Sequence, residues 1–198
     1  MRIGIEVNGV LRNTIEKIAQ TYQKFLIDRV DGLEETEDFK YEVNLPIESL
    51  NLRDFLNFKD DEELYTFLYE EFPMEIFGHS QSTEYSTFND LNELYIRLRE
   101  DHDFIIVSDE IGKSKPATLF FLSKFGCQFE KIKFYSNYTI NSMWDEIDIL
   151  LTANPALLLD YPSDKKIIKF NTVYNKQSES SHSINSIKEL EEKLKEII

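Results

Sequence analysis

The chain has 198 residues, of which 41% are hydrophobic and 13% aromatic, so it can bury the core of one domain or of a core with one insertion. This composition excludes a disordered chain and two large independent domains. Thirty-seven acidic against 22 basic residues give a net charge of −15, which disfavours binding to nucleic acid or to an anionic membrane. A lone cysteine, Cys127, cannot form an intramolecular disulfide, and the N-terminal residues hold no apolar stretch long enough for a signal peptide or a membrane span. We therefore expect a cytoplasmic protein.

The N-terminal segment predicts a strand, a turn and a helix. Residues 2–7 alternate in polarity and are rich in β-branched side chains, which is typical of a strand. Asn8 and Gly9 follow as a turn signal. From residue 14 to residue 27 the apolar side chains recur at helical spacing.

Four further strands are expected, each from a short apolar run. They are residues 104–108, 131–135, 147–151 and 166–170. Helices are expected over 115–125, ended by Gly126, and over 154–159. Strands that alternate with helices at this spacing predict an α/β fold with a Rossmann-like, mostly parallel sheet flanked by helices.

Residues 28–89 interrupt this alternation. The segment holds an acidic run, an amphipathic helix closed by Pro73, and a polar loop that leads to a helix over 88–99. The run is Glu34, Glu35, Glu37 and Asp38, the amphipathic helix covers 61–72 and the loop covers 78–87. We expect a largely helical, cap-type insertion over 28–89, inside a core formed by 1–27 and 90–176.

The C-terminal residues 177–198 predict a polar hinge over 177–183 and an amphipathic helix over 184–198. Its apolar stripe is formed by Ile187, Leu190, Leu194 and Ile198. This stripe can dock onto the helices of the core or onto another protein, and the pattern leaves both alternatives open.

Three segments at the predicted strand ends carry a resemblance to a known family. They read IGIEVNGVL over 3–11, IIVS over 105–108 and IDILLTANP over 147–155. These segments resemble motifs of the haloacid dehalogenase-like (HAD) superfamily, especially its 5′-deoxynucleotidase-like branch. The resemblance implies a HAD-like core, in which ligands bind beyond the carboxyl ends of the strands.

The same segments differ from the family where the resemblance assigns catalysis. Glu6 and Asn8 stand in place of two Asp, Ser108 matches the second motif, the third-motif Lys falls near Tyr138, and Thr152 and Ala153 replace an acidic pair. The Glu6 side chain is one methylene longer than Asp, the Asn8 amide has no titratable proton, and Thr152 and Ala153 offer magnesium no carboxylate. We therefore expect these positions to be vestigial, with no cofactor and no metal.

The first hypothesis is a catalytically degenerate HAD-like protein that acts as a structural or protein-binding module, such as a phage virion or assembly component. Its partner would be another protein or a second copy of the chain, bound through the insertion at 28–89.

Two alternatives keep a working pocket. One is a weak magnesium-dependent phosphatase or 5′-nucleotidase in which Glu6 acts with Asp109 or Glu110. The missing cation would then come from a displaced lysine: Lys113, Lys115, Lys131 or Lys133. The other alternative is a non-catalytic sensor of a nucleotide or of phosphate.

Overall fold

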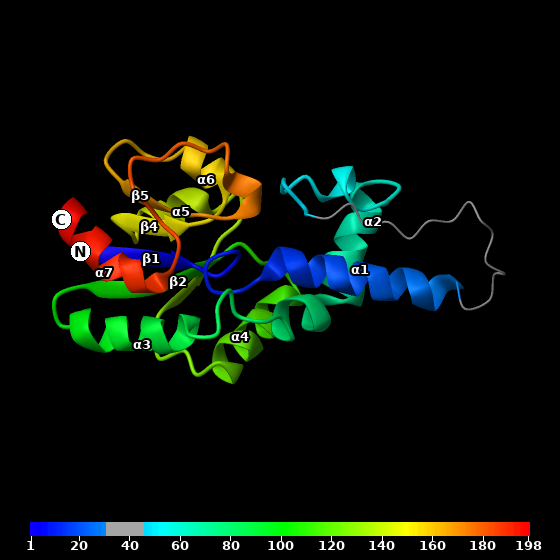
Figure 1. Cartoon of the computed structure of the whole chain (residues 1–198), viewed down its shortest axis with the longest axis horizontal. Helices are drawn as coiled ribbons and strands as arrows, with labels where there is room; N and C mark the ends of the chain where they lie inside the picture. The colour runs from blue at the N-terminus through cyan, green and yellow to red at the C-terminus, as the bar shows by residue number, and fades with distance from the viewer. Residues whose placement is uncertain (31–45) are drawn as a thin grey trace.

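A six-stranded, all-parallel sheet forms the centre of the molecule in the computed structural model, which describes residues 1–30 and 46–198 (Figure 1). The strand order is β3-β2-β1-β4-β5-β6. The strands are β1 (Arg2–Glu6), β2 (Asp103–Ser108), β3 (Ile132–Phe134), β4 (Ile149–Thr152), β5 (Lys166–Phe170) and β6 (Ser183–Ile184). The predicted fold class and its first five strands are confirmed, whereas β6 was not predicted.

The strand register brings the carboxyl ends of β1, β2 and β4 to one edge of the sheet. Glu6 lies opposite Val107 of β2, and Ile5 lies opposite Leu151 of β4. The strand β1 occupies the middle because its residues are apolar on both faces, as buried parallel strands require. The first polar side chain after this apolar run, Glu6, therefore stands at the edge where ligands bind in open parallel sheets.

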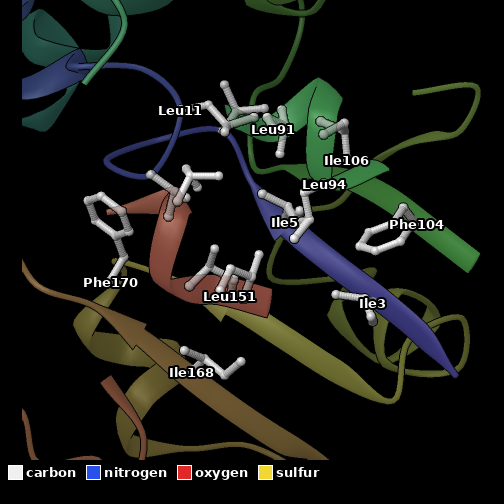
Figure 2. Close-up of a cluster of buried hydrophobic side chains, with 14 of the residues drawn as sticks. Ile3, Ile5, Leu11, Leu91, Leu94, Phe104, Ile106, Leu151, Ile168 and Phe170 are labelled. Atoms are coloured by element: carbon white, nitrogen blue, oxygen red, sulfur yellow. The ribbon is translucent and has the colours of Figure 1, made fainter. Parts of the chain in front are cut away.

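Helices cover both faces of the sheet. One face carries α3 (Thr87–Leu98), α4 (Ser114–Lys124) and α7 (Leu190–Ile197), and the other carries α5 (Ile140–Trp144) and α6 (Pro155–Leu159). Figure 2 shows Leu91 and Leu94 of α3 near Ile5 and Ile106 of the sheet. The buried side chains of this face form one continuous apolar core.

A second apolar cluster lies mainly in a region that we call the cap, which consists of α1 (Thr14–Val30) and residues 46–78. The helical segments within 46–78 are the 3-10 helix η1 (Leu52–Asp54), α2 (Asp61–Thr66) and the π-helical turns η2 (Phe67–Glu71) and η3 (Met74–Gly78). Figure 1 shows α1 leading away from the sheet. The ring of Tyr22 in α1 lies 4.8 Å from the ring of Phe58 and 5.9 Å from that of Phe67, so aromatic contacts hold the cap together. The acidic run at 34–38 lies outside the described residues.

The predicted helix over 61–72 does end before Pro73, but only its first part is α-helical. The helix is α-helical only over α2, widens into η2, and Pro73 then opens η3 with a φ of −61°. A proline fits the first turn of a helical segment because its missing N–H has no partner there. The start of the helix follows the sequence signal, since the Asp60 side chain accepts a hydrogen bond from the Glu63 amide at 2.9 Å.

The predicted C-terminal helix begins too early. Residues 183–184 form β6 beside β5, a 3-10 turn η5 (Ile187–Glu189) follows, and α7 begins only at Leu190. Pairing with β5 leaves the Ile184 side chain fully buried, and this outweighs the helical pattern. The stripe docks onto the chain's own sheet, because Leu190 and Leu194 are buried there, while Ile198 stays 56% exposed.

None of the described helices combines the length and the apolar character that crossing a bilayer needs. The cytoplasmic location, the boundaries of the insertion at 28 and 89 and a protein partner bound through that insertion stay predictions.

Candidate functional site

A cleft of about 380 Å³ lies at the carboxyl edge of the sheet, between the strand ends and the cap. Its polar floor comes from the loops after β1, β2 and β4 and is formed mainly by Glu6, Asn8, Asp109, Glu110 and Asn154. Its apolar wall comes from the cap. The sequence predicted that Glu6, Asn8, Ser108, Thr152 and Ala153 lie at one edge of the sheet. In the structure Glu6 contacts Thr152 and Ala153, while Asn8 and Ser108 both contact Glu110.

Glu6 is a buried carboxyl group with no basic partner among the described residues. Its Oε1 accepts a hydrogen bond from the Tyr135 hydroxyl at 2.8 Å. Its Oε2 accepts from the Thr152 hydroxyl and from the Ala153 amide, the latter at 3.3 Å. Burial, and secondly the charge of Asp109, raise the pKa of Glu6 to about 8. The side chain is therefore mainly protonated at neutral pH.

Asp109 faces the same cleft from the loop after β2. Its Oδ1 accepts a hydrogen bond from Asn8 Nδ2 at 2.6 Å, and the same amide donates to Glu110 Oε1 at 2.8 Å. Burial and the neighbouring Glu110 raise the pKa of Asp109 to about 6, so this carboxyl is mainly ionised at neutral pH. The Asn8 amide thus bridges Asp109 and Glu110.

A fully buried cation, Arg12, lies beneath this pair, and the sequence analysis missed it. Its guanidinium forms an ion pair with Glu110 and donates to Asn8 Oδ1 at 2.7 Å. It also donates to the Phe77 carbonyl and to the Thr118 hydroxyl, each at 2.8 Å. Arg12 therefore fastens the floor of the cleft to the cap. The only sequence feature that could have pointed to Arg12 as a site residue is its place shortly after the Asn8-Gly9 turn.

The turn after β1 requires a glycine. Gly9 has a φ of +74°, a left-handed conformation that L side chains rarely adopt. A Cβ at this position would lie 1.8 Å from the Tyr174 hydroxyl oxygen and 2.8 Å from the Ala153 Cβ. The close approach packs Tyr174 beside the floor of the cleft, which it lines.

The expected third-motif position does not reach the site. Tyr138 is 99% exposed and is not among the residues that line the cleft. The lysines weighed as replacements are engaged elsewhere: Lys113 pairs with Glu70, Lys131 with Asp103 and Lys133 with Glu146, while Lys115 lies over the Phe134 ring. Among the described residues, the cation nearest the floor acids is Arg12, which the chain supplies from the loop after β1.

The described residues do not fit the magnesium ion that the resemblance implies for this family. Three protein donors already engage both oxygens of the Glu6 carboxyl group. The Thr152 hydroxyl points at Glu6, and Ala153 has no ligand atom in its side chain. In the described part of the chain, no three His, Cys, Asp or Glu side chains gather as metal ligands. The chemistry of this floor is that of two titratable carboxyl groups.

The chain has the α/β fold seen in solved structures of the HAD superfamily. No protein-family model and no curated protein sequence matches it.

Three solved structures illustrate the match. A predicted phosphatase from Clostridium acetobutylicum is 15% identical, with a TM-score of 0.57 over 98% of both chains. A HAD family hydrolase from Deinococcus radiodurans R1, with bound phosphate and sodium, is 14% identical, with a TM-score of 0.58 over 98% of this chain and 95% of that chain. A conserved haloacid dehalogenase-like protein of unknown function from Agrobacterium tumefaciens is 10% identical, with a TM-score of 0.60 over 99% and 98%. At these identities the likeness shows the fold.

The hypothesis of a degenerate structural or protein-binding module, with its phage virion or assembly role, is wrong. The solved structures that share the fold include a predicted phosphatase, a HAD family hydrolase and a dehalogenase. The phosphatase alternative agrees better with these relatives. The roles of Glu6, Asn8, Ser108, Tyr138, Thr152 and Ala153 stay predictions.

Proposed function

We propose that the protein is a hydrolase of the phosphatase type, in which Glu6 and Asp109 act as an acid and base pair on a phosphate monoester. One observation carries this proposal: two carboxyl groups face a single cleft at the carboxyl edge of the sheet, with pKa values raised to about 8 and about 6. Carboxyl groups whose pKa values lie on either side of neutral pH are suited to act as acid and base.

The base in this reaction is Asp109. Ionised and oriented by Asn8, it accepts a proton from a water molecule whose oxygen attacks phosphorus. The acid is Glu6, because its protonated carboxyl group donates to the ester oxygen as the bond between phosphorus and that oxygen breaks. The products are inorganic phosphate and an alcohol.

The floor carries less negative charge than its three carboxyl groups would suggest. Arg12 neutralises Glu110, and Glu6 is mainly uncharged at neutral pH because its pKa is raised to about 8. Asp109 is then the floor's one uncompensated negative charge among the described residues. The phosphatase resemblance and the phosphate-bound relative of the same fold support a phosphate ester as the substrate class.

The pH dependence of hydrolysis tests this proposal. The value of kcat/KM should rise through a pKa near 6, as Asp109 ionises, and fall through a pKa near 8, as Glu6 loses its proton. Asp109→Asn should remove the acidic limb and Glu6→Gln the alkaline limb, each with a loss of roughly 10²-fold or more. Addition of EDTA should leave the wild-type rate unchanged.

Matched controls are Asp101→Asn and Glu130→Gln, which alter exposed carboxylates outside the cleft. Both controls should retain the wild-type profile. The proposal fails if the protein releases no phosphate from phenyl phosphate, or if the two cleft variants hydrolyse it as fast as their controls.

A further inference from the structure

The cleft has two chemically different ends. The floor presents carboxyl and amide groups, whereas the wall formed by the cap is apolar. The apolar lining consists of Ile15, Ile18, Leu50, Leu52, Leu64 and Leu68, together with the aromatic rings of Tyr65, Tyr69 and Phe77. A ligand held by its phosphate at the floor would place the rest of its structure against this wall.

The aromatic part of the wall is continuous. The rings of Tyr65 and Tyr69 lie 5.1 Å apart, and those of Tyr69 and Phe77 lie 5.7 Å apart and nearly parallel, at 12°. Aromatic side chains in this arrangement offer both ring faces and ring edges to a further ring. The wall can therefore extend its own stacking to a flat ligand.

Part of this apolar surface remains accessible. Tyr65 is 44% exposed and Leu50 is 41% exposed, and both line the cleft. Burying such a surface under a ligand would contribute to binding through the hydrophobic effect. The cleft volume of about 380 Å³ is at the small end of ligand sites, which suits one ring attached to a phosphate.

The wall has no group that would attract a negative charge. No lysine or arginine appears among the described residues that line the cleft, and the carboxylate of Asp61, which also lines it, forms an exposed ion pair with Arg53. A leaving group with its own carboxylate or phosphate would therefore be disfavoured.

We propose that the substrate is an aryl phosphate monoester, whose uncharged aromatic leaving group lies against the cap wall near Tyr65 and Tyr69. This inference rests on the proposed phosphatase function and names the substrate class of the same cleft. The phosphate then lies at the floor, where Asp109 and Glu6 reach the attacking water and the ester oxygen.

Three non-hydrolysable phosphonates test the substrate class separately from turnover. Phenylphosphonate should bind the wild-type protein about tenfold more tightly than methylphosphonate, because its ring covers the apolar wall. A carboxylate on the ring, as in 4-carboxyphenylphosphonate, should weaken binding. Isothermal titration calorimetry measures all three affinities without requiring any reaction.

Two variants locate the aromatic subsite. Tyr65→Ala and Leu50→Ala should each reduce the preference for phenylphosphonate over methylphosphonate, Tyr65→Ala by about tenfold. Both residues are partly exposed, which favours a folded variant. Tyr85→Ala and Leu119→Ala are the matched controls, since Tyr85 is fully exposed and Leu119 is 47% exposed outside the cleft.

The outcomes separate the two proposals. A phenyl preference that Tyr65→Ala removes supports the aryl subsite, even if phenyl phosphate is not hydrolysed and the proposed function fails. Equal affinities for the phenyl and methyl ligands, no binding of either, or a phenyl preference that survives in both cleft variants would overturn the aryl subsite.

Discussion

Two buried glutamates lie at the carboxyl ends of neighbouring strands, Glu6 as the last residue of β1 and Glu110 two residues after β2, and their surroundings differ. Glu6 and Glu110 are each 1% exposed. Glu110 has Arg12 as its ion-pair partner, whereas Glu6 has only neutral donors from Tyr135, Thr152 and Ala153. The pKa of Glu6 is raised to about 8, mainly by burial. The comparison shows that two equally buried carboxyl groups of one site have different partners, a cation for Glu110 and neutral donors for Glu6.

Removal of the Arg12 cation should produce the largest loss of folding stability. Arg12→Met would leave the Glu110 carboxylate buried without its partner and would break the link to the Phe77 carbonyl. We expect the free energy of unfolding to fall by about 3–5 kcal/mol in urea titrations at neutral pH. The control Arg97→Met removes an exposed pair with Glu191 and should cost less than about 1 kcal/mol. Equal losses in the two variants would contradict the structural role of Arg12.

The titration of Glu6 should change folding stability by a smaller amount, which depends on pH. Since its pKa is raised from 4.5 to about 8, the folded state binds this proton more tightly than the unfolded state does. Its contribution to stability is therefore complete below pH 4.5 and declines as the pH rises to about 8. Asp109 changes stability in the same direction, but its pKa of about 6 places most of that change at lower pH.

Between pH 6 and pH 8, the pH dependence of stability from these two groups therefore comes mainly from Glu6. Over this window the wild-type protein should lose about 2 kcal/mol more stability than Glu6→Gln, whose amide does not titrate. Urea titrations at the two pH values measure the difference. Parallel losses in wild type and variant would show that Glu6 is ionised throughout.

Asp148, which pairs with Arg2 at the opposite end of β1, should make the smallest contribution to stability. This contribution is lost at low pH, whereas that of Glu6 is lost at high pH. Arg2 donates to Asp148 from its side chain and backbone and lowers the pKa of Asp148 to about 2. Its stabilising contribution is present above pH 3.8 and is lost as the pH falls towards 2. Because the pair is partly solvent-exposed, Asp148→Asn should cost about 1 kcal/mol at neutral pH and almost nothing at pH 2. Thermal melts at both pH values check this, and a loss that persists at pH 2 would rule out the ion pair as its cause.

The strand runs and the parallel topology could be predicted because their signals are local. The apolar run at 166–170 coincides with β5, and Gly126 follows α4 with a φ of +68°. Parallel strand ends must share one edge of a sheet, so the proximity of Glu6 to Thr152 also followed from the pattern. Each of these inferences needed only the chain's own periodicity or the geometry of a parallel sheet.

The failures concern residues whose surroundings come from distant parts of the chain. Ile184 fits a helical stripe, yet pairing with β5 makes it part of a strand. Arg12 reads as an ordinary polar residue after a turn, and only the folded chain surrounds it with Glu110, Phe77 and Thr118. Tyr138 was placed by its spacing from the fourth motif, and the structure leaves it in solvent.

The sequence by itself determined the α/β class, the strand that carries Glu6 and the acidic residues near its end, because periodicity and turn chemistry are properties of neighbouring residues. Only the tertiary structure decided which acid keeps its charge, where the buried cation lies and that apolar cap residues face the cleft. Charge state and ligand preference depend on burial and on partners as far as 146 residues away, as for Glu6 and Thr152, and no local pattern encodes those distances.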